Sequence, residues 1–148
     1  MTHVTRVHFY HNAEHPLALA CELAQRAWGG GRKVALRVPD AATARALDEL
    51  LWSFDPLAFV PHVMADSPLA AETPVIIGRA DAPAPWPHED VLLNLADDIP
   101  AGFERFRMLV EVVGQAEAHK LQARARWKHY KQRDLPLQAF DAVRREAI

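Results

Sequence analysis

The stretch Leu17-Ala-Leu-Ala-Cys-Glu-Leu-Ala-Gln-Arg-Ala-Trp-Gly-Gly-Gly-Arg-Lys-Val-Ala-Leu-Arg-Val38 decides the fold class. Its first half repeats apolar residues every three or four positions, as at Leu19 and Leu23, which predicts a helix over 17–28. Three glycines then end the helix, because glycine is common just past a helix C-terminus. The compact apolar run 33–38 predicts a buried strand.

The alternation of helices and strands extends in both directions along the chain. Residues 4–10 alternate and are rich in β-formers, which predicts a strand before the helix. Asp40 is placed to cap a second helix over 41–52. A β-α-β-α order favours an α/β domain with a mostly parallel sheet and helices on both faces. Further strands are predicted at 74–78, 91–95 and 108–113, and a short helix ending near 107.

Composition narrows the class of protein. Half of the 148 residues are apolar and 24% are charged, as in ordinary globular domains. No run approaches the ~20 apolar residues of a membrane span, and the first residues lack a signal-peptide pattern, so we expect a cytosolic protein. One cysteine, Cys21, excludes an internal disulfide. Without repeats or linkers we expect one domain over 1–148, with a mobile tail after about residue 136.

A basic segment is the main functional signal. Residues 120–133 contain six Lys or Arg and no acid, so the rest of the chain carries a net charge of −8. The segment predicts a long helix that ends before Pro136. Arg124, Trp127, Lys128 and Lys131 share one face of this helix, at spacings of three and four. We therefore expect an exposed indole among cations.

An apolar stripe on the same helix is the predicted core contact. Ala118, Leu121 and Ala125 recur at helical spacing beside the cations, and we expect them to dock on the core. The adjoining face, with its indole and cations, would then suit a partner that combines negative charge with an apolar or aromatic group. A merely solvated basic face is the alternative. Direct binding of single-stranded nucleic acid, in which bases stack on aromatic rings among cations, is another.

A proline-bounded segment after the second helix is the other unusual feature. Trp52 ends that helix, and tryptophan in such a place usually packs in the core. Residues 57–62 put Leu57 and Phe59 on a loop. Exposed there, the two side chains would mark a partner site. The alternative is that the loop folds under the sheet.

Other candidate chemistry is weak. The glycines at 29–31 follow a helix and precede a strand, whereas a phosphate loop follows a strand and opens a helix. The histidines at 8, 11 and 15 match no zinc spacing. Cys21 has no neighbouring base, and the acid pairs 89–90 and 97–98 suit turns and caps. We expect no catalytic residue, no cofactor and no metal.

Several stretches in order along the chain resemble the chi subunit of bacterial DNA polymerase III. The most specific is Trp52 followed by Phe59-Val-Pro-His62. The others are Val7-His-Phe-Tyr10, Gly31-Arg-Lys-Val34, Leu47-Asp-Glu-Leu-Leu-Trp-Ser-Phe54, Glu72-Thr-Pro-Val75, Val91-Leu-Leu-Asn-Leu95 and Arg124-Ala-Arg-Trp-Lys-His-Tyr130.

The resemblance implies a non-enzymatic accessory protein of the clamp loader, with a nucleotide-binding-like fold that lacks a phosphate loop. It implies two partners: the psi subunit, and the acidic C-terminal tail of single-stranded DNA-binding protein, which ends in Pro-Phe. Contact with nucleic acid would be mainly indirect, and the protein cytoplasmic and nucleoid-associated through the replisome. Some relatives also pair with a helicase-like protein, and the sequence leaves open which partner is used here.

Site residues carry over by position. The tail site corresponds to Arg124, Trp127, Lys128 and Trp52. The psi patch corresponds to Phe59 and Pro61. We add Leu57, which lies on the same loop.

The chemistry of these residues gives the expected mode of tail binding. Arg124 would pair with the terminal carboxylate, since guanidinium is a planar donor suited to carboxylates. The Phe ring would lie against Trp127 and Trp52. Lys128, Lys131 and Arg126 would meet the upstream acids.

Two hypotheses compete with this one. The first is a protein that binds single-stranded nucleic acid directly through helix 120–133. The second is an enzyme with a nucleotide site at the end of the first strand, although no phosphate loop is present.

Overall fold

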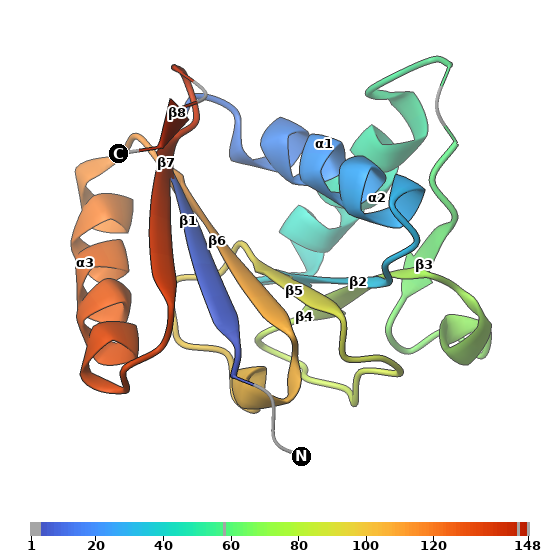
Figure 1. Cartoon of the computed structure of the whole chain (residues 1–148). Coiled ribbons are helices and arrows are strands. Elements are labelled where there is room, and N and C mark those ends of the chain that lie inside the picture. Colours follow the sequence, from blue (N-terminus) through green and yellow to red (C-terminus); the bar gives the residue numbers. More distant parts are fainter. Residues whose placement is uncertain (1–3, 58, 145, 148) are drawn as a thin grey trace.

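The computed structural model describes residues 4–57, 59–144 and 146–147, and its backbone forms one twisted sheet with helices on both faces (Figure 1). In the described residues the sheet has eight strands in the order β3-β4-β2-β5-β6-β1-β7-β8. All neighbouring pairs from β3 to β7 are parallel, and β8 runs antiparallel to β7. The strands are β1 (Arg6–Ala13), β2 (Val34–Val38), β3 (His62–Met64), β4 (Val75–Arg79), β5 (Val91–Asn94), β6 (Met108–Gly114), β7 (Leu137–Asp141) and β8 (Glu146–Ala147).

The first two helices begin and end within one residue of their predicted bounds. In α1 (Pro16–Gly29), proline stands in the first turn, where its missing N–H costs no hydrogen bond. Gly31, two residues past the helix, has φ of 85°, a conformation that glycine adopts without strain. α2 (Ala41–Ser53) is capped by Asp40, whose Oδ1 accepts a hydrogen bond from the Thr43 N–H at 2.8 Å. α3 is Glu117–Gln132.

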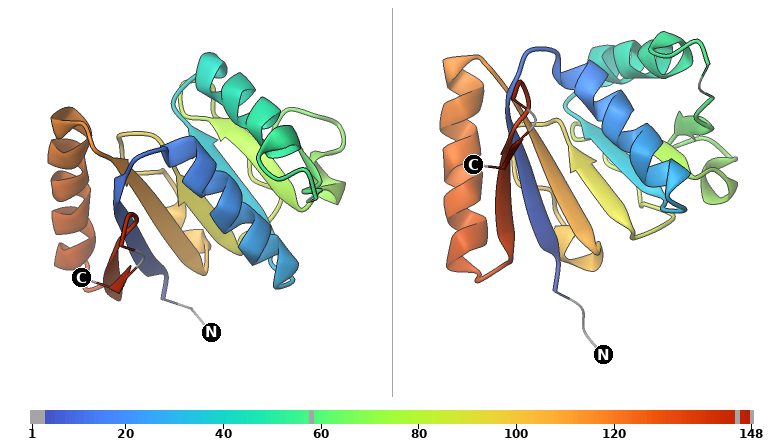
Figure 2. Two further views of the ribbon diagram at one scale, coloured as in Figure 1. Left: turned by 90° about the horizontal axis from the view of Figure 1, so that it is seen from above. Right: turned by 45° about the horizontal axis from the view of Figure 1, so that its top comes forward.

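Each face of the sheet has its own apolar core. α1 and α2 pack on one face, around Leu36, Leu47 and Ile77. α3 packs on the other, around Phe9, Leu109 and Tyr130. The two views of Figure 2 show α3 on the far side of the sheet from α1 and α2. Side chains on α2 and α3 are therefore separated by the sheet.

The predicted α/β class and mostly parallel sheet are confirmed, but the strands β3, β7 and β8 were not predicted. β3 was not predicted, because it holds only three residues between irregular segments. Within the tail expected after about residue 136, residues 137–141 form β7 and pair with β1. The short helix predicted before residue 107 is a 3₁₀ turn at Phe103–Arg105, and a second one lies at Ala70–Glu72.

Candidate functional site: two exposed surfaces on opposite faces

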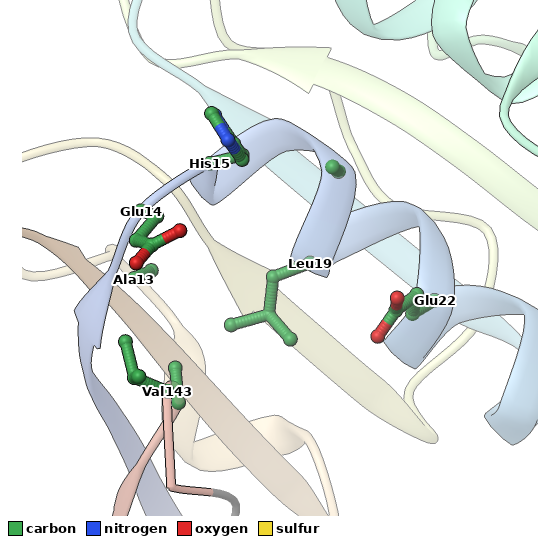
Figure 3. Close-up of a pocket in the computed structure, with 8 residues that line it drawn as sticks. Ala13, Glu14, His15, Leu19, Glu22 and Val143 are labelled. Atoms are coloured by element: carbon green, nitrogen blue, oxygen red, sulfur yellow. The ribbon is translucent and has the colours of Figure 1, made fainter.

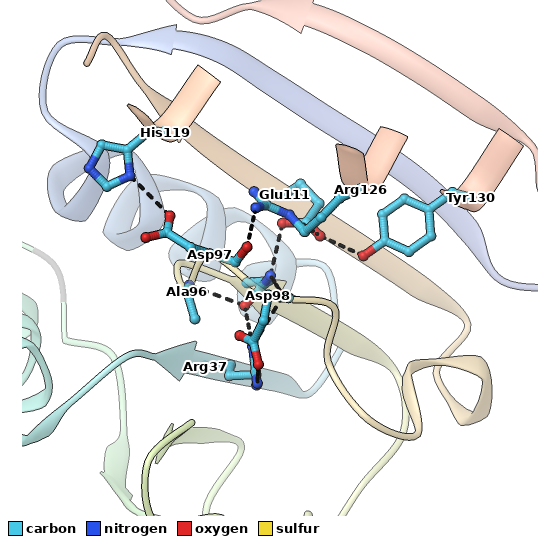
Figure 4. A network of polar contacts seen from close by, with 9 residues as sticks. Arg37, Ala96, Asp97, Asp98, Glu111, His119, Arg126 and Tyr130 are labelled. Carbon is cyan, nitrogen blue, oxygen red and sulfur yellow. Dashed lines mark hydrogen bonds and ion pairs between the residues drawn. The ribbon is translucent and has the colours of Figure 1, made fainter. Parts of the chain in front are cut away.

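The inner face of α3 is held by polar side chains. Glu111, in the middle of β6, is fully buried. It accepts hydrogen bonds from Tyr130 Oη at 2.6 Å and Asn94 Nδ2 at 2.9 Å. Arg126 Nε lies 3.2 Å from the same carboxylate, and Arg126 Nη1 donates to the Asp97 carbonyl at 2.7 Å (Figure 4). Two residues of α3 are thus tied to Glu111 of β6, and one of them also to the loop after β5.

This network fixes how α3 is rotated. Burial raises the pKa of Glu111, and the nearby Arg126 charge opposes that shift. A buried ion pair adds little net stability as a pair, but removing one partner leaves an uncompensated buried charge. With Arg126 and Tyr130 pointing inward, Arg124 and Lys128 point away from the sheet.

The predicted apolar docking stripe of α3 is wrong. Leu121 is 67% exposed, and Ala118 and Ala125 are exposed as well. The buried residues of α3 are instead Ala123, Arg126 and Tyr130. The expectation that Arg126 meets an acidic partner is also wrong, because its side chain is buried against Glu111.

Half of the cations in 120–133 have partners within the protein. Lys120 lies 3.7 Å from Glu117, Arg126 pairs with Glu111, and Arg133 Nη1 lies 3.6 Å from Glu104. In the described part of the chain, the remaining three form no ion pair. These three, Arg124, Lys128 and Lys131, are exposed and are the cations that helical spacing placed on one face.

Trp127 is less exposed than predicted. Its ring packs edge-on against Phe9 with centroids 5.1 Å apart, so the indole is partly buried on the sheet. The His11 ring stacks on the Phe9 ring with centroids 5.5 Å apart. Its centroid lies 6.4 Å from that of the Trp127 ring. We call Arg124, Trp127, Lys128, Lys131 and His11 the α3 surface. It combines a rigid aromatic edge with unpaired cations.

Trp52 does not join the α3 surface. Its ring lies 5.6 Å from Phe59 and 4.9 Å from His62, on the α2 side of the sheet. The predicted pocket in which Trp52 and Trp127 hold one ring together is therefore not formed. Trp52 and Phe59 are 58% and 60% exposed, and Leu57 is 97% exposed. Pro61 is partly buried beside them. We call Trp52, Leu57, Phe59 and Pro61 the apolar patch; residue 58 lies outside the described residues.

A buried histidine holds the loop that carries the apolar patch. His62 Nδ1 lies 2.7 Å from the Val60 carbonyl, and Nε2 lies 3.1 Å from Asp48 Oδ1 on α2. Val60 itself is in the core. Because these two residues point inward, Phe59 stays exposed. The loop therefore presents its apolar side chain to solvent and does not fold under the sheet.

The pocket at the start of α1 does not suit a phosphate group. A pocket of about 260 Å³ lies where a nucleotide-binding fold holds phosphate, at the end of β1 and the start of α1. Glu14 and Glu22 line it (Figure 3), and carboxylates there disfavour an anion. No group of three or more described His, Cys, Asp or Glu side chains could hold a metal. Burial raises the pKa of Cys21 to about 12, which leaves it an inert thiol.

Two features were missed from the sequence. Glu111 is one acid within an otherwise apolar strand, and that position was its signal. His11 shows no such signal, since its contact with Trp127 joins β1 to a helix more than a hundred residues later. No described helix has the length and apolar character needed to cross a membrane.

Comparison with known proteins identifies the family. The model of the family "DNA polymerase III chi subunit, HolC" matches residues 4–138. The chain belongs to the DNA polymerase III chi family. The protein named DNA polymerase III subunit chi in Pseudomonas aeruginosa is 36% identical over 139 residues, which cover 91% of this chain and 95% of that protein.

Two further chi relatives agree. The chi subunit of Haemophilus influenzae is 34% identical over 74% of this chain and 76% of its own length. The chi subunit of Escherichia coli is 30% identical over 76% of this chain and 76% of its own length. The resemblance found in the sequence motifs is therefore confirmed, and with it a place among the accessory subunits of the replicative polymerase.

Proposed function

We propose that this chi-family protein is a non-catalytic connector within the DNA polymerase III holoenzyme. One surface binds the psi subunit and the other binds the C-terminal tail of single-stranded DNA-binding protein. The supporting observation is the pair of exposed, chemically different surfaces on opposite faces of one sheet. Separate faces allow both partners to bind at the same time.

The α3 surface suits an acidic tail that ends in an aromatic residue. Arg124 is exposed and has no ion pair among the described residues, so its guanidinium is available for a terminal carboxylate. The terminal ring would lie against the edge of Trp127 and the neighbouring His11. Lys128 and Lys131 would meet the upstream acids. A disordered tail loses entropy on binding, so we expect an affinity near ~1 μM.

The apolar patch suits a psi subunit that buries aromatic side chains. Phe59 and Trp52 are exposed rings in contact, and exposed aromatics are frequent anchors in protein interfaces. This proposal moves Trp52 from the tail site to the psi site, because its ring contacts are Phe59 and His62. Leu57 and Pro61 would extend the contact.

Titration of variants with the tail peptide tests the first half of the proposal. Arg124→Ala should weaken binding at least tenfold, while the melting temperature stays within a few degrees. Arg45→Ala is the matched control, since Arg45 is exposed on α2 and forms no ion pair in the described chain. Equal affinity for Arg124→Ala and the parent protein would remove Arg124 from the site.

Association with purified psi tests the second half. Phe59→Ala should weaken that association and leave tail binding unchanged. Leu69→Ala is the control, because Leu69 is also exposed but lies outside the patch. Loss of both bindings with Phe59→Ala, together with a lower melting temperature, would indicate misfolding and would leave the patch without support.

Direct binding of single-stranded DNA is the second candidate. Three cations of the basic segment, Lys120, Arg126 and Arg133, form ion pairs within the protein. This argues against direct DNA binding, because affinity for phosphates grows with the number of free cations. A labelled oligonucleotide mixed with the isolated protein at moderate salt separates the two functions. Saturable binding that Lys128→Ala abolishes would favour the nucleic-acid reading.

A further inference from the structure

A groove at the C-terminal end of α1 belongs to neither proposed surface. It has a volume of about 300 Å³ and lies between α1 and the first residues of β2, β5 and β6. Its apolar floor includes Met108, which is partly exposed, and Val34 and Val110, which are buried. Leu23 and Ala27 of α1 form one wall, and His8 and Tyr10 of β1 form the other. In both views of Figure 2, β1 and β7 lie to the side of α1.

The charged residues of this groove are all cations. Arg26 and Arg32 line it and are exposed, and the lining residues include no acid. Neither arginine forms an ion pair in the described part of the chain. The pocket at the other end of α1 is lined instead by Glu14 and Glu22. The two pockets beside α1 are therefore lined by charged residues of opposite sign.

His8, in the wall of the groove, adds no charge of its own at neutral pH. Burial, and then the charge of Arg6, lowers the pKa of the His8 imidazole. His8 is therefore neutral at neutral pH and adds an apolar edge to the wall. A ligand for this groove must supply negative charge at the rim and an apolar group for the floor.

The aromatic residues beside the groove do not suit nucleic-acid bases. Tyr10 stacks on Phe140 of β7 with centroids 5.0 Å apart and ring planes 20° apart. The edge of His8 also contacts Phe140, at 5.3 Å. Ring faces that contact one another are not free to stack on bases. The concave aliphatic floor instead fits a side chain such as Leu or Phe, and guanidinium groups pair well with carboxylates.

We propose that the groove between α1 and the amino ends of β2, β5 and β6 binds a short acidic segment of a partner protein. One aliphatic or aromatic side chain of the segment would pack on the floor at Met108, against Leu23 and Ala27 of α1. Carboxylates on either side of it would pair with Arg26 and Arg32. The segment needs no free C-terminus, which separates this site from the α3 surface.

A peptide with blocked ends tests the proposal on the full chain. The probe is acetyl-Asp-Asp-Leu-Phe-Asp-Asp-amide, which offers no terminal carboxylate to Arg124. In ¹H–¹⁵N spectra it should shift the amides of Leu23, Val34 and Met108, with half-saturation below ~1 mM. The same peptide with Asn for each Asp should bind at least tenfold more weakly.

Variants then separate charge, shape and fold. The double variant Arg26→Glu/Arg32→Glu should weaken binding at least tenfold, whereas Arg45→Glu on α2 should not change it. Gly30→Trp should obstruct the mouth of the groove. A side chain at Gly30 meets only ordinary contacts of 3.5 Å, and its φ of −87° suits any residue. An unchanged melting temperature would show that this variant is folded.

Three results would overturn the proposal. The first is equal binding of the Asn peptide, since charge would then have no part. The second is saturable shifts confined to α3, since the probe would then use the other surface. The third is displacement of the probe from the groove by a twelve-nucleotide oligothymidine, since the groove would then be a nucleic-acid site. Loss of tail or psi binding would affect the proposed function and leave this site untouched.

Discussion

The α3 surface and the apolar patch are positioned by different forces. α3 is fixed by a buried carboxylate that contacts both Arg126 and Tyr130. The loop of the apolar patch is fixed by one buried histidine and one buried valine. The first surface consists of long cations beside a ring packed on the core, and the second of rings packed on each other. The unpaired cations of α3 and the exposed rings of the apolar patch thus lie on opposite faces of the sheet.

The comparison indicates where each surface is vulnerable. Substitutions far from the cations, inside the sheet, should disable the α3 surface because they change the rotation of the helix. The apolar patch should depend mainly on its own rings and on their loop. The following experiments test that contrast.

Removal of Glu111 should have the largest effect. Glu111→Ala leaves Arg126 as a buried charge without its partner, and we expect a loss of about 3–5 kcal/mol in the free energy of unfolding. Denaturant titration measures this loss. Glu111→Gln, which keeps an acceptor for Tyr130 or Asn94, should lose less. A loss below about 1 kcal/mol for the alanine variant would mean that the network does not anchor α3.

Truncation of Trp52 should have the next largest effect, and on one partner alone. Trp52→Ala removes the ring beside Phe59, and we expect psi association to weaken by about 2 kcal/mol, or roughly thirtyfold. Tail affinity, measured by titration on the same preparation, should not change. A fall in tail affinity alone would return Trp52 to the tail site and end the contrast between the two faces.

Replacement of His62 tests the loop itself. His62→Ala removes the contacts with Val60 and Asp48, at a cost of about 1–2 kcal/mol in stability. Psi association should fall with it, and tail binding should remain. Asp48→Asn, which keeps the His62 ring, is the milder control. Tail binding that falls as much as psi binding would show that the loop and α3 are coupled.

The pH dependence of tail binding should be the smallest effect. Burial lowers the pKa of His11, and the charge of Asp141 opposes that shift, so the ring is mostly neutral at pH 7. An acidic tail beside His11 would favour the protonated ring, so affinity should rise as the pH falls from 7.5 to 5.5, by about twofold. His11→Gln should remove this rise, whereas His119→Gln on α3 should retain it. The same rise in both variants would exclude His11.

The sequence predicted the elements whose signals are local. Helix spacing over 17–28 and the Asp40 cap gave α1 and α2, and apolar runs gave the central strands. β7 was missed because its pairing with β1 joins segments far apart in the chain. Such pairing leaves little trace in a five-residue strand whose side chains are only partly buried.

The site was predicted only in part, for a similar reason. Spacing identified Arg124, Lys128 and Lys131 as neighbours, because that relation lies within one helix. Spacing could not show which way the helix faces, since Arg126 turns inward to a carboxylate on β6. Nor could it show that Trp52 and Trp127 lie across a sheet from one another. The family resemblance supplied the partners but not this geometry.

The placement of the tryptophans gives the protein two optical probes. Of the four indoles, Trp52 is exposed, whereas Trp28, Trp86 and Trp127 are all partly buried. A soluble quencher such as acrylamide should therefore dim Trp52 first. A protein that covers the apolar patch would shield that emission, and a tail on α3 would instead change the emission of Trp127. Occupancy of each face could then be followed in one cuvette, without a label.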